Sequence, residues 1–254
     1  MIRESLGKHY IGMNKEFRFR GEEPGRLENV SDGVFALAIT LLLISTNAPV
    51  NFDEIRKFVW ELLPFCVCIV LIILIWHEHF VFFYRYGFRN TKIVVLNTLF
   101  LIIVLFYVYP LKFLFKFLSF LVMGRIFNEE SLSTEISQMF RGDDTAADLM
   151  IIYGTGAASI FIVLMLMYRY ALKQSHLLQL NEIEKFDTRT SMISNLLMAT
   201  VPCLSVILAV VLRNNPSVGI ITGFTYFLYT PMMLIFHFRT SKKRKKLLDE
   251  NVLT

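Results

Sequence analysis

Apolar blocks of the length needed to cross a lipid bilayer recur along this chain, and they constrain its fold more than any other feature. A membrane-spanning helix needs about 20 mostly apolar residues. The chain has 254 residues, of which 55% are hydrophobic and only 19% are charged. We therefore predict an all-α integral membrane protein with six transmembrane helices, at residues 27–47, 58–83, 91–109, 148–170, 190–212 and 217–238.

The Lys and Arg residues are unevenly distributed between the two sides of this predicted bundle. If the N-terminus is cytoplasmic, 19 of the 26 lie on the cytoplasmic side, in the two terminal segments and in the second and fourth connections between helices. Cytoplasmic segments of membrane proteins carry such an excess. We expect both termini in the cytoplasm, with an N-terminal segment (1–26), a six-helix domain (27–238) and a basic tail (239–254).

The charge excess also bears on partners. A net charge of +5 can attract nucleic acid, but in a membrane protein it usually reports orientation. We therefore expect the lipid bilayer, and not nucleic acid, as a partner. The tail sequence "SKKRKK" at 241–246 is most simply a charge cluster that stops membrane translocation, and binding of anionic lipid is the alternative.

Prolines and polar stretches mark where helices are expected to end or bend. Pro110 is expected to break or kink the third helix, so residues 111–122 either lie at the membrane interface or continue that helix. The acidic residues of 128–144 predict a solvated loop. Pro202 and Pro231 are possible breaks in the fifth and sixth helices. The small residues of the fourth helix, Gly154, Gly156, Ala157 and Ala158, favour close helix packing.

The sequence lacks the motifs of the common enzyme classes. It contains no phosphate-binding loop, no HExxH and no nucleophile elbow, so we expect no enzyme activity and no cofactor. His77 and His79 are two residues apart on a helix and diverge, which argues against a metal site. No re-entrant pore loop is evident. The three cysteines lie in apolar blocks and predict no disulfide framework: Cys66, Cys68 and Cys203.

The first predicted helix, "NVSDGVFALAITLLLI" from residue 29, places polar groups at membrane depth. Its apolar part alone is too short for about 30 Å of hydrocarbon, so Ser31 and Asp32 must face protein or water. At 1.5 Å per residue, these two and His77 and Asn97 lie about 8–9 Å inside the cytoplasmic ends of their helices. We favour a structural hydrogen-bond network over a proton relay for this layer.

The same helix carries an apolar stripe. Gly33, Leu37, Leu41 and Ile44 recur at helical spacing, and Thr40 borders them. A stripe of this kind is most often core. Because this helix is short and interior, a second interpretation is that the stripe forms apolar rings around a symmetry axis, which gate by dewetting.

The first helix resembles that of the transmembrane protein 175 family, the lysosomal and prokaryotic potassium channels. In "RLENVSDGVFALAIT" the family's basic residue, Ser-Asp pair and later threonine are matched by Arg26, Ser31, Asp32 and Thr40, while Val30 replaces the usual Phe. "IWHEH" and "VVLNTLF" supply residues similar to those of the family's second and third helices. These are Trp76, His77 and Asn97.

The resemblance implies a potassium-selective channel with potassium as the permeant ion and no cofactor. It implies a homotetramer, as in the prokaryotic single-unit form, in which the first helix of each subunit lines a central pore of a prokaryotic plasma membrane. It further implies a hydrophobic constriction at Leu37, Leu41 and Ile44 and a selectivity role for Thr40. The structural polar network would comprise Arg26, Ser31, Asp32, Trp76, His77 and Asn97. A secondary transporter of a small cation or solute is the main alternative, although no internal repeat supports it.

Overall fold

The computed structural model describes residues 17–43, 51–127, 145–215 and 217–252, and within these ranges the regular structure is entirely helical. Ile44 and the predicted acidic loop at 128–144 lie outside the described residues. The elements are α2 (Arg26–Leu43), α3 (Phe52–Tyr86), α4 (Thr91–Phe127), α6 (Thr145–Lys173), α7 (Glu182–Val211), α8 (Val218–Phe224), η1 (Thr225–Leu228) and α9 (Tyr229–Val252).

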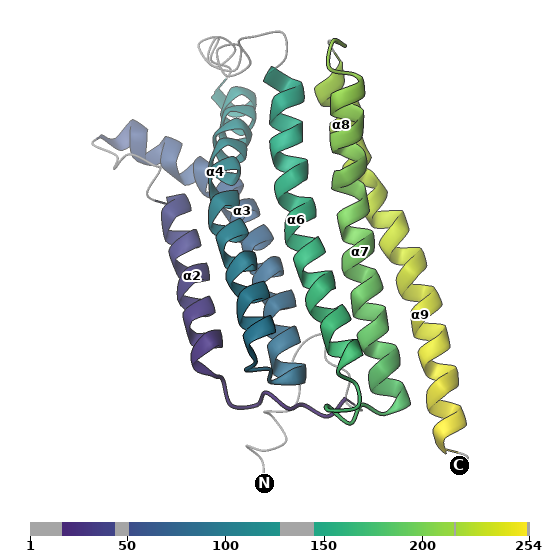
Figure 1. Cartoon of the computed structure of the whole chain (residues 1–254). Helices are drawn as coiled ribbons and strands as arrows, with labels where there is room; N and C mark the ends of the chain where they lie inside the picture. The colour runs from purple at the N-terminus through teal and green to yellow at the C-terminus, as the bar shows by residue number, and fades with distance from the viewer. Residues whose placement is uncertain (1–16, 44–50, 128–144, 216, 253–254) are drawn as a thin grey trace.

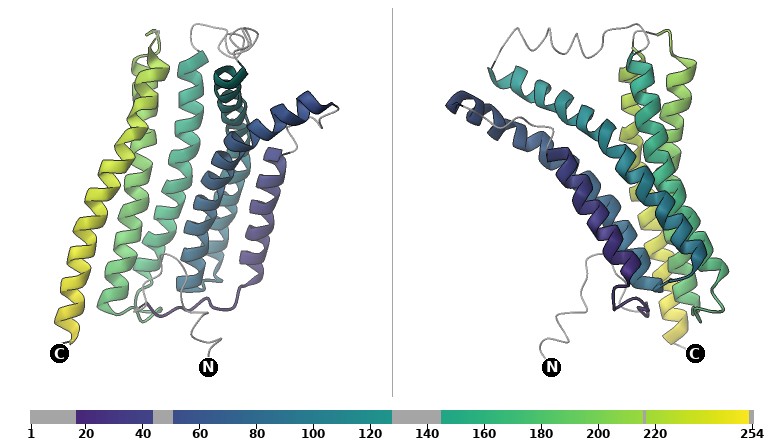
Figure 2. Two further views of the ribbon diagram at one scale, coloured as in Figure 1. Left: turned by 180° about the vertical axis from the view of Figure 1, so that it is seen from behind. Right: turned by 60° about the vertical axis from the view of Figure 1, so that its left-hand side comes forward.

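The helices run side by side in one elongated bundle (Figure 1). The extended residues before α2 and the last turn of α9 lie at the same end of this bundle. Figure 2 shows that α2, α3 and α4 converge with α6, α7 and α9 at that end and splay away from them at the other. The chain therefore has two helical groups, which meet where the charged connections lie.

Among the described residues, five helices are long and apolar enough to cross a membrane by length and composition, which confirms most of the six predicted spans. The first predicted span, α2, is not among them. It has 18 residues, and Arg26, Glu28 and Asp32 all lie in its first two turns. Its length is about 27 Å at 1.5 Å per residue, so it needs the shelter of neighbouring helices to lie within a bilayer.

Of the two outcomes expected at Pro110, the break is wrong, because α4 continues through it to Phe127. Of the two alternatives for residues 111–122, the structure has the one in which they continue the third helix. A proline removes one backbone donor and disturbs the carbonyl one turn earlier. Here neighbouring helices contact the backbone at this point. The Tyr153 hydroxyl donates to the Pro110 carbonyl, and Cys68 Sγ lies 3.8 Å from the Leu111 carbonyl oxygen. Packing against α3 and α6 thus supports the helix across the proline.

The other two prolines also lie inside helices. Pro202 is enclosed within α7, which is unbroken. The sixth span does change geometry, but at the 3-10 turn Thr225–Leu228, just before Pro231. Pro231 itself falls in the first turn of α9, where the backbone N–H groups have no partner within the helix and a proline is tolerated. The helix then continues past residue 238 through the basic tail.

Small residues bring α6 close to its neighbours, as predicted. A Cβ added at Gly154 would lie 2.9 Å from the Pro202 carbonyl oxygen of α7, and one at Gly156 would lie 2.5 Å from the Tyr107 ring of α4. Because these two residues lack a side chain, the backbone of α7 and the Tyr107 ring of α4 can lie directly against α6. Helix α6 therefore joins the two helical groups.

The largest core cluster joins α2, α3, α4 and α6, and its largest fully buried side chains are aromatic. Phe82 and Phe83 of α3, Phe100 of α4 and Tyr168 of α6 are all almost completely buried. Phe82 and Tyr168 meet edge to face at 5.2 Å between ring centroids, a favourable geometry for aromatic pairs. This cluster fixes the helices that hold the polar residues described next.

Candidate functional site

Helix α2 has one face packed on the rest of its own chain. Ser31, Phe35, Ala38 and Leu42 are buried and follow helical spacing. Among the helices of the described chain, α2 packs only on α3 and α4. This face is core.

The predicted apolar stripe lies on the opposite side of α2. Leu37 is 49% exposed and Val30 is 61% exposed. Gly33 is exposed, with nothing within 4 Å of an added Cβ, and Leu41 is half-buried. An apolar row left uncovered by its own chain is therefore presented outward along α2. The last stripe residue, Ile44, is outside the described residues.

Thr40 lies on the exposed side of α2 and bonds its own helix. Its hydroxyl donates to the Ala36 carbonyl at 2.8 Å. This bond, from a threonine to the carbonyl four residues earlier, is common in membrane helices. It uses the hydroxyl proton and leaves both lone pairs of the oxygen to accept a hydrogen bond or to coordinate a cation.

A polar layer joins α2 to α3 and α4 near the end of the bundle where the basic connections gather. Trp76 Nε1 donates to Asp32 Oδ1 at 2.8 Å, and Asn97 Nδ2 donates to Ser31 Oγ at 2.9 Å. Ser31 Oγ in turn donates to the Leu27 carbonyl at 2.8 Å. The structure thus brings together four of the six predicted network residues.

The structure adds His79 to the predicted layer. The imidazole beside Asn97 is that of His79 and not that of His77, with His79 Nε2 2.7 Å from Asn97 Oδ1. His79 is 2% exposed, whereas His77 is only partly buried. Of two histidines separated by about 200° around a helix, only one can face the core, and the Phe100 ring stacks on His79 at 5.2 Å. The sixth member, Arg26, is exposed at the start of α2.

The direction of these bonds bears on proton transfer. The Asn97 carbonyl oxygen can only accept, so His79 Nε2 carries the proton and donates it. The chain of donors then runs from His79 through Asn97 and Ser31 to the Leu27 carbonyl. A backbone carbonyl is not a proton acceptor in the acid–base sense, so this order favours a structural network over a relay.

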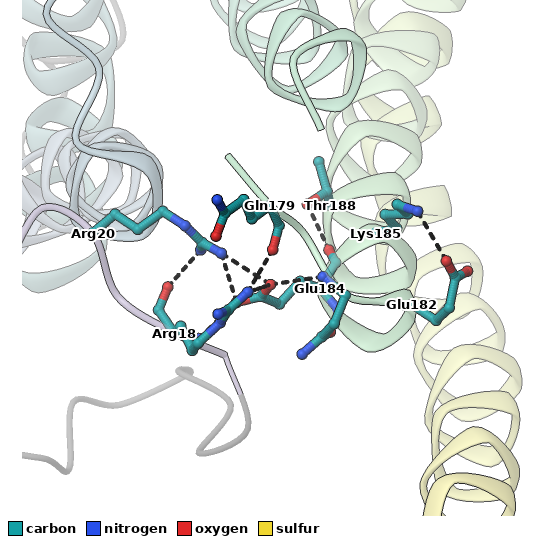
Figure 3. A network of polar contacts seen from close by, with 8 residues as sticks. Arg18, Arg20, Gln179, Glu182, Glu184, Lys185 and Thr188 are labelled. Atoms are coloured by element: carbon teal, nitrogen blue, oxygen red, sulfur yellow. Dashed lines mark hydrogen bonds and ion pairs between the residues drawn. The ribbon is translucent and has the colours of Figure 1, made fainter. Parts of the chain in front are cut away.

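A second polar cluster was not predicted from the sequence. Glu184, in the first turn of α7, is fully buried and accepts bonds from Arg18 and Arg20, which precede α2 (Figure 3). Asn181 and Glu184 also form a reciprocal capping box at the start of α7. The spacing Asn-x-x-Glu is a sequence signal for that helix start, but no local signal identifies the arginines 164 residues away.

The basic tail has a specific contact as well. In α9, Nε of Arg244 donates a hydrogen bond to Asp187 Oδ1 at 2.9 Å, and a terminal nitrogen of Arg244 donates a second one to Asp187 Oδ2 at 3.2 Å. This two-point pair attaches the tail to α7. Among the described residues, no three His, Cys, Asp or Glu side chains gather in a way that would hold a metal ion.

Comparison with known proteins follows the same elements. A family model described as "Endosomal/lysosomal potassium channel TMEM175" matches residues 26–107, from the start of α2 into α4. A protein of Marivirga tractuosa named "Potassium channel" is 44% identical over 242 residues, which cover 94% of this chain and 97% of that relative. The chain belongs to the TMEM175 family.

A solved TMEM175 structure has the same fold. The crystal structure of a variant of the potassium channel MtTMEM175, in complex with a Nanobody-MBP fusion protein, has 43% sequence identity and a TM-score of 0.80. The match covers 91% of this chain and 100% of that one. The resemblance of the first helix to this family is thus confirmed.

Membership of the TMEM175 family establishes the class of the molecule. It is an integral membrane protein, and since the family and the matched relatives are channels, it is not an enzyme. The residues matched by the family model carry the whole polar layer of Ser31, Asp32, Trp76, His79 and Asn97. The Glu184 cluster lies outside the matched residues, because Arg18 and Arg20 precede residue 26 and Glu184 belongs to α7.

Proposed function

We propose that this TMEM175 protein is a homotetrameric potassium-selective channel of a prokaryotic plasma membrane, with α2 of each subunit lining a central pore. The observation that carries the proposal is the two-faced α2: one face is buried in its own subunit, while the apolar row with Leu37 is uncovered. The relative from Marivirga tractuosa, named a potassium channel and 44% identical over nearly its whole length, supports the activity and the prokaryotic membrane.

Several subunits are needed because one chain supplies one α2. A single helix cannot enclose a pore, and closed rotational symmetry turns the uncovered face into rings of identical side chains. In such rings Leu37, Leu41 and Ile44 form successive apolar constrictions. A ring of this kind conducts when it is wet and closes when water leaves it.

Thr40 supplies the polar atom nearest to these rings. Its hydroxyl proton is bonded to Ala36, and the lone pairs of the same oxygen are left for an ion or for ordered water. Potassium holds its hydration shell less tightly than sodium, so a neck that removes part of the shell favours potassium. We propose that the Thr40 oxygen strengthens this preference for potassium over sodium.

The orientation and domain limits follow from charge. The extended residues before α2 and the tail of α9 lie at one end of the bundle, where the basic connections gather, and we propose that this end is cytoplasmic. The limits 1–26, 27–238 and 239–254 describe charge and not folding units, because α9 passes through residue 238 without a break.

Reconstitution tests this function. Native mass spectrometry of the detergent-purified protein should give four subunits. In planar bilayers with opposed potassium and sodium gradients, we expect discrete current steps that reverse toward the potassium equilibrium potential. The competing function is secondary transport of a small cation or solute. It predicts saturable, coupled flux without unitary steps, and that result together with a monomer would exclude the channel.

A further inference from the structure

The residues just before α2 form an extended segment that crosses the base of the bundle. We call residues 17–25 the strap. It runs from the start of α2 to the base of α6 and α7 (Figure 1). Since α2 packs only on α3 and α4 among the described helices, the strap is what joins α2 to α7.

The strap pairs with the end of α3 through its backbone. The Arg20 amide donates to the Arg85 carbonyl at 3.3 Å, and the Gly21 amide donates to the Tyr84 carbonyl at 3.1 Å. The last carbonyls of a helix have no partner within it. The strap therefore supplies donors that the end of α3 requires, and α3 in turn determines where the strap lies.

Two glycines make this backbone crossing possible. A Cβ on Gly21 would lie 2.2 Å from the Phe83 carbonyl oxygen, and one on Gly87 would lie 2.5 Å from the Arg20 carbonyl oxygen. Gly87 also has a φ of 57°, in the left-handed region. A side chain at Gly21 would have to push backbone away from backbone, so the strap would leave its position.

Aromatic contacts hold the same segment. Phe17 is buried, meets Tyr86 edge to face at 5.8 Å and lies under the Arg85 guanidinium at 5.1 Å. Phe19 packs on Tyr84 at 4.7 Å. Phe17 and Phe19 therefore anchor the first part of the strap on the end of α3.

Glu184 joins this segment to α7. Its carboxylate accepts from the Arg18 amide at 2.9 Å and from a terminal nitrogen of Arg20 at 3.1 and 3.0 Å (Figure 3). The same carboxylate accepts from the Asn181 amide at 2.9 Å. A fully buried carboxylate is stable only when paired and hydrogen-bonded in this way. Removing its charge therefore weakens the bonds that hold the side chains of Arg18 and Arg20 in place.

We infer that Glu184 is a positioning residue for the pore helix: through Arg18, Arg20 and the strap it holds the base of α2 back toward α7. This inference rests on the proposed pore-lining role of α2. The buried face of α2 turns toward α3 and α4, and its uncovered face turns away from them. A pull toward α7 therefore draws α2 away from the pore axis and favours the wider, conducting arrangement.

Two variants release the strap by independent routes. Glu184→Gln removes the charge that binds the arginines, and Gly21→Ala removes the backbone crossing without touching Glu184. Lys185→Gln is the matched control, because Lys185 is the next residue along α7 and pairs only with the exposed Glu182 in the contacts of Figure 3. All three are made in the full-length protein.

The first measurement does not depend on conduction. Hydrogen exchange of the native protein in detergent should show protected amides at residues 18–21. Both release variants should exchange there roughly 10- to 100-fold faster, as expected for losing bonds to a charged group, while Lys185→Gln matches the native protein. Equal protection in all four proteins would overturn the proposed attachment.

The second measurement is the single-channel record in potassium. Both release variants should have an open fraction about 2- to 30-fold lower, with unitary conductance and reversal potential unchanged, because the constriction residues are intact. Faster exchange of the strap with an unchanged or higher open fraction would overturn the coupling and leave the channel function standing. Native protein without any current, but with a protected strap, would instead overturn the proposed function and with it the coupling.

Discussion

Trp76 Nε1 donates a 2.8 Å hydrogen bond to Asp32 Oδ1, so the carboxylate near the start of α2 is held by α3. The adjacent residue, Ser31, is bonded to Asn97 of α4. Two bonds at neighbouring positions, about 100° apart around one helix, restrict the rotation of α2 about its own axis. The uncovered side of α2 is thereby determined by its polar residues.

Replacing Asp32 tests this restraint. We expect Asp32→Ala to lower stability by about 1–3 kcal/mol and to reduce the yield of assembled protein, because the Trp76 indole N–H loses its acceptor. Thermal unfolding in detergent, followed by size-exclusion chromatography, measures both effects. Asn29→Ala, an exposed change on the same helix, is the control. A stable tetramer with altered ion selectivity would place Asp32 in the ion path.

The two histidines of α3 should differ in their effect on stability. His79→Phe keeps a ring in the core but removes the donor to Asn97, so we expect a loss of about 1–3 kcal/mol. His77→Phe, at a partly exposed position, should cost less than about 1 kcal/mol. Thermal unfolding of both variants side by side measures the difference. The opposite order would return His77 to the polar layer.

Leu37 should control the leak through the closed pore. Leu37→Ala widens its ring and removes apolar surface, and Leu37→Asn makes the same ring easier to wet by polarity. We expect larger currents from both in planar bilayers, with weaker discrimination from Leu37→Ala. Val210→Ala, an exposed apolar change on α7, should leave current unaltered. Native current in both Leu37 variants would mean that Leu37 packs against protein in the assembly.

Thr40 should influence the preference for potassium over sodium. Thr40→Val keeps the shape of the side chain and removes its oxygen, and with it the bond to Ala36. If that oxygen serves the ion path, the reversal potential under opposed gradients moves toward zero while the tetramer stays intact. If the reversal potential does not move, Thr40 only bonds the Ala36 carbonyl. The width of the pore would then be the only source of the selectivity for potassium over sodium.

Much of the fold was predictable because it depends on local pattern. Long apolar runs predicted the membrane-spanning helices, and small residues predicted the close packing of α6. The helical spacing of Gly33, Leu37 and Leu41 predicted a common face for them. Ser31, Asp32 and Asn97 were correctly placed in one layer, because depth in a membrane helix follows directly from rise per residue.

The remaining features depended on which neighbours the fold supplied. Depth alone could not choose between His77 and His79, since that choice requires knowing which face of α3 meets α4. The contact that α4 makes at Pro110 comes from Tyr153, a residue of another helix. The bond between Arg20 and Glu184 joins residues 164 positions apart, which only tertiary packing brings together. Sequence therefore determined most of the helices and the apolar row of α2. The tertiary structure decided which side chains complete the polar contacts, because a buried polar group takes whatever partner the packing places within reach.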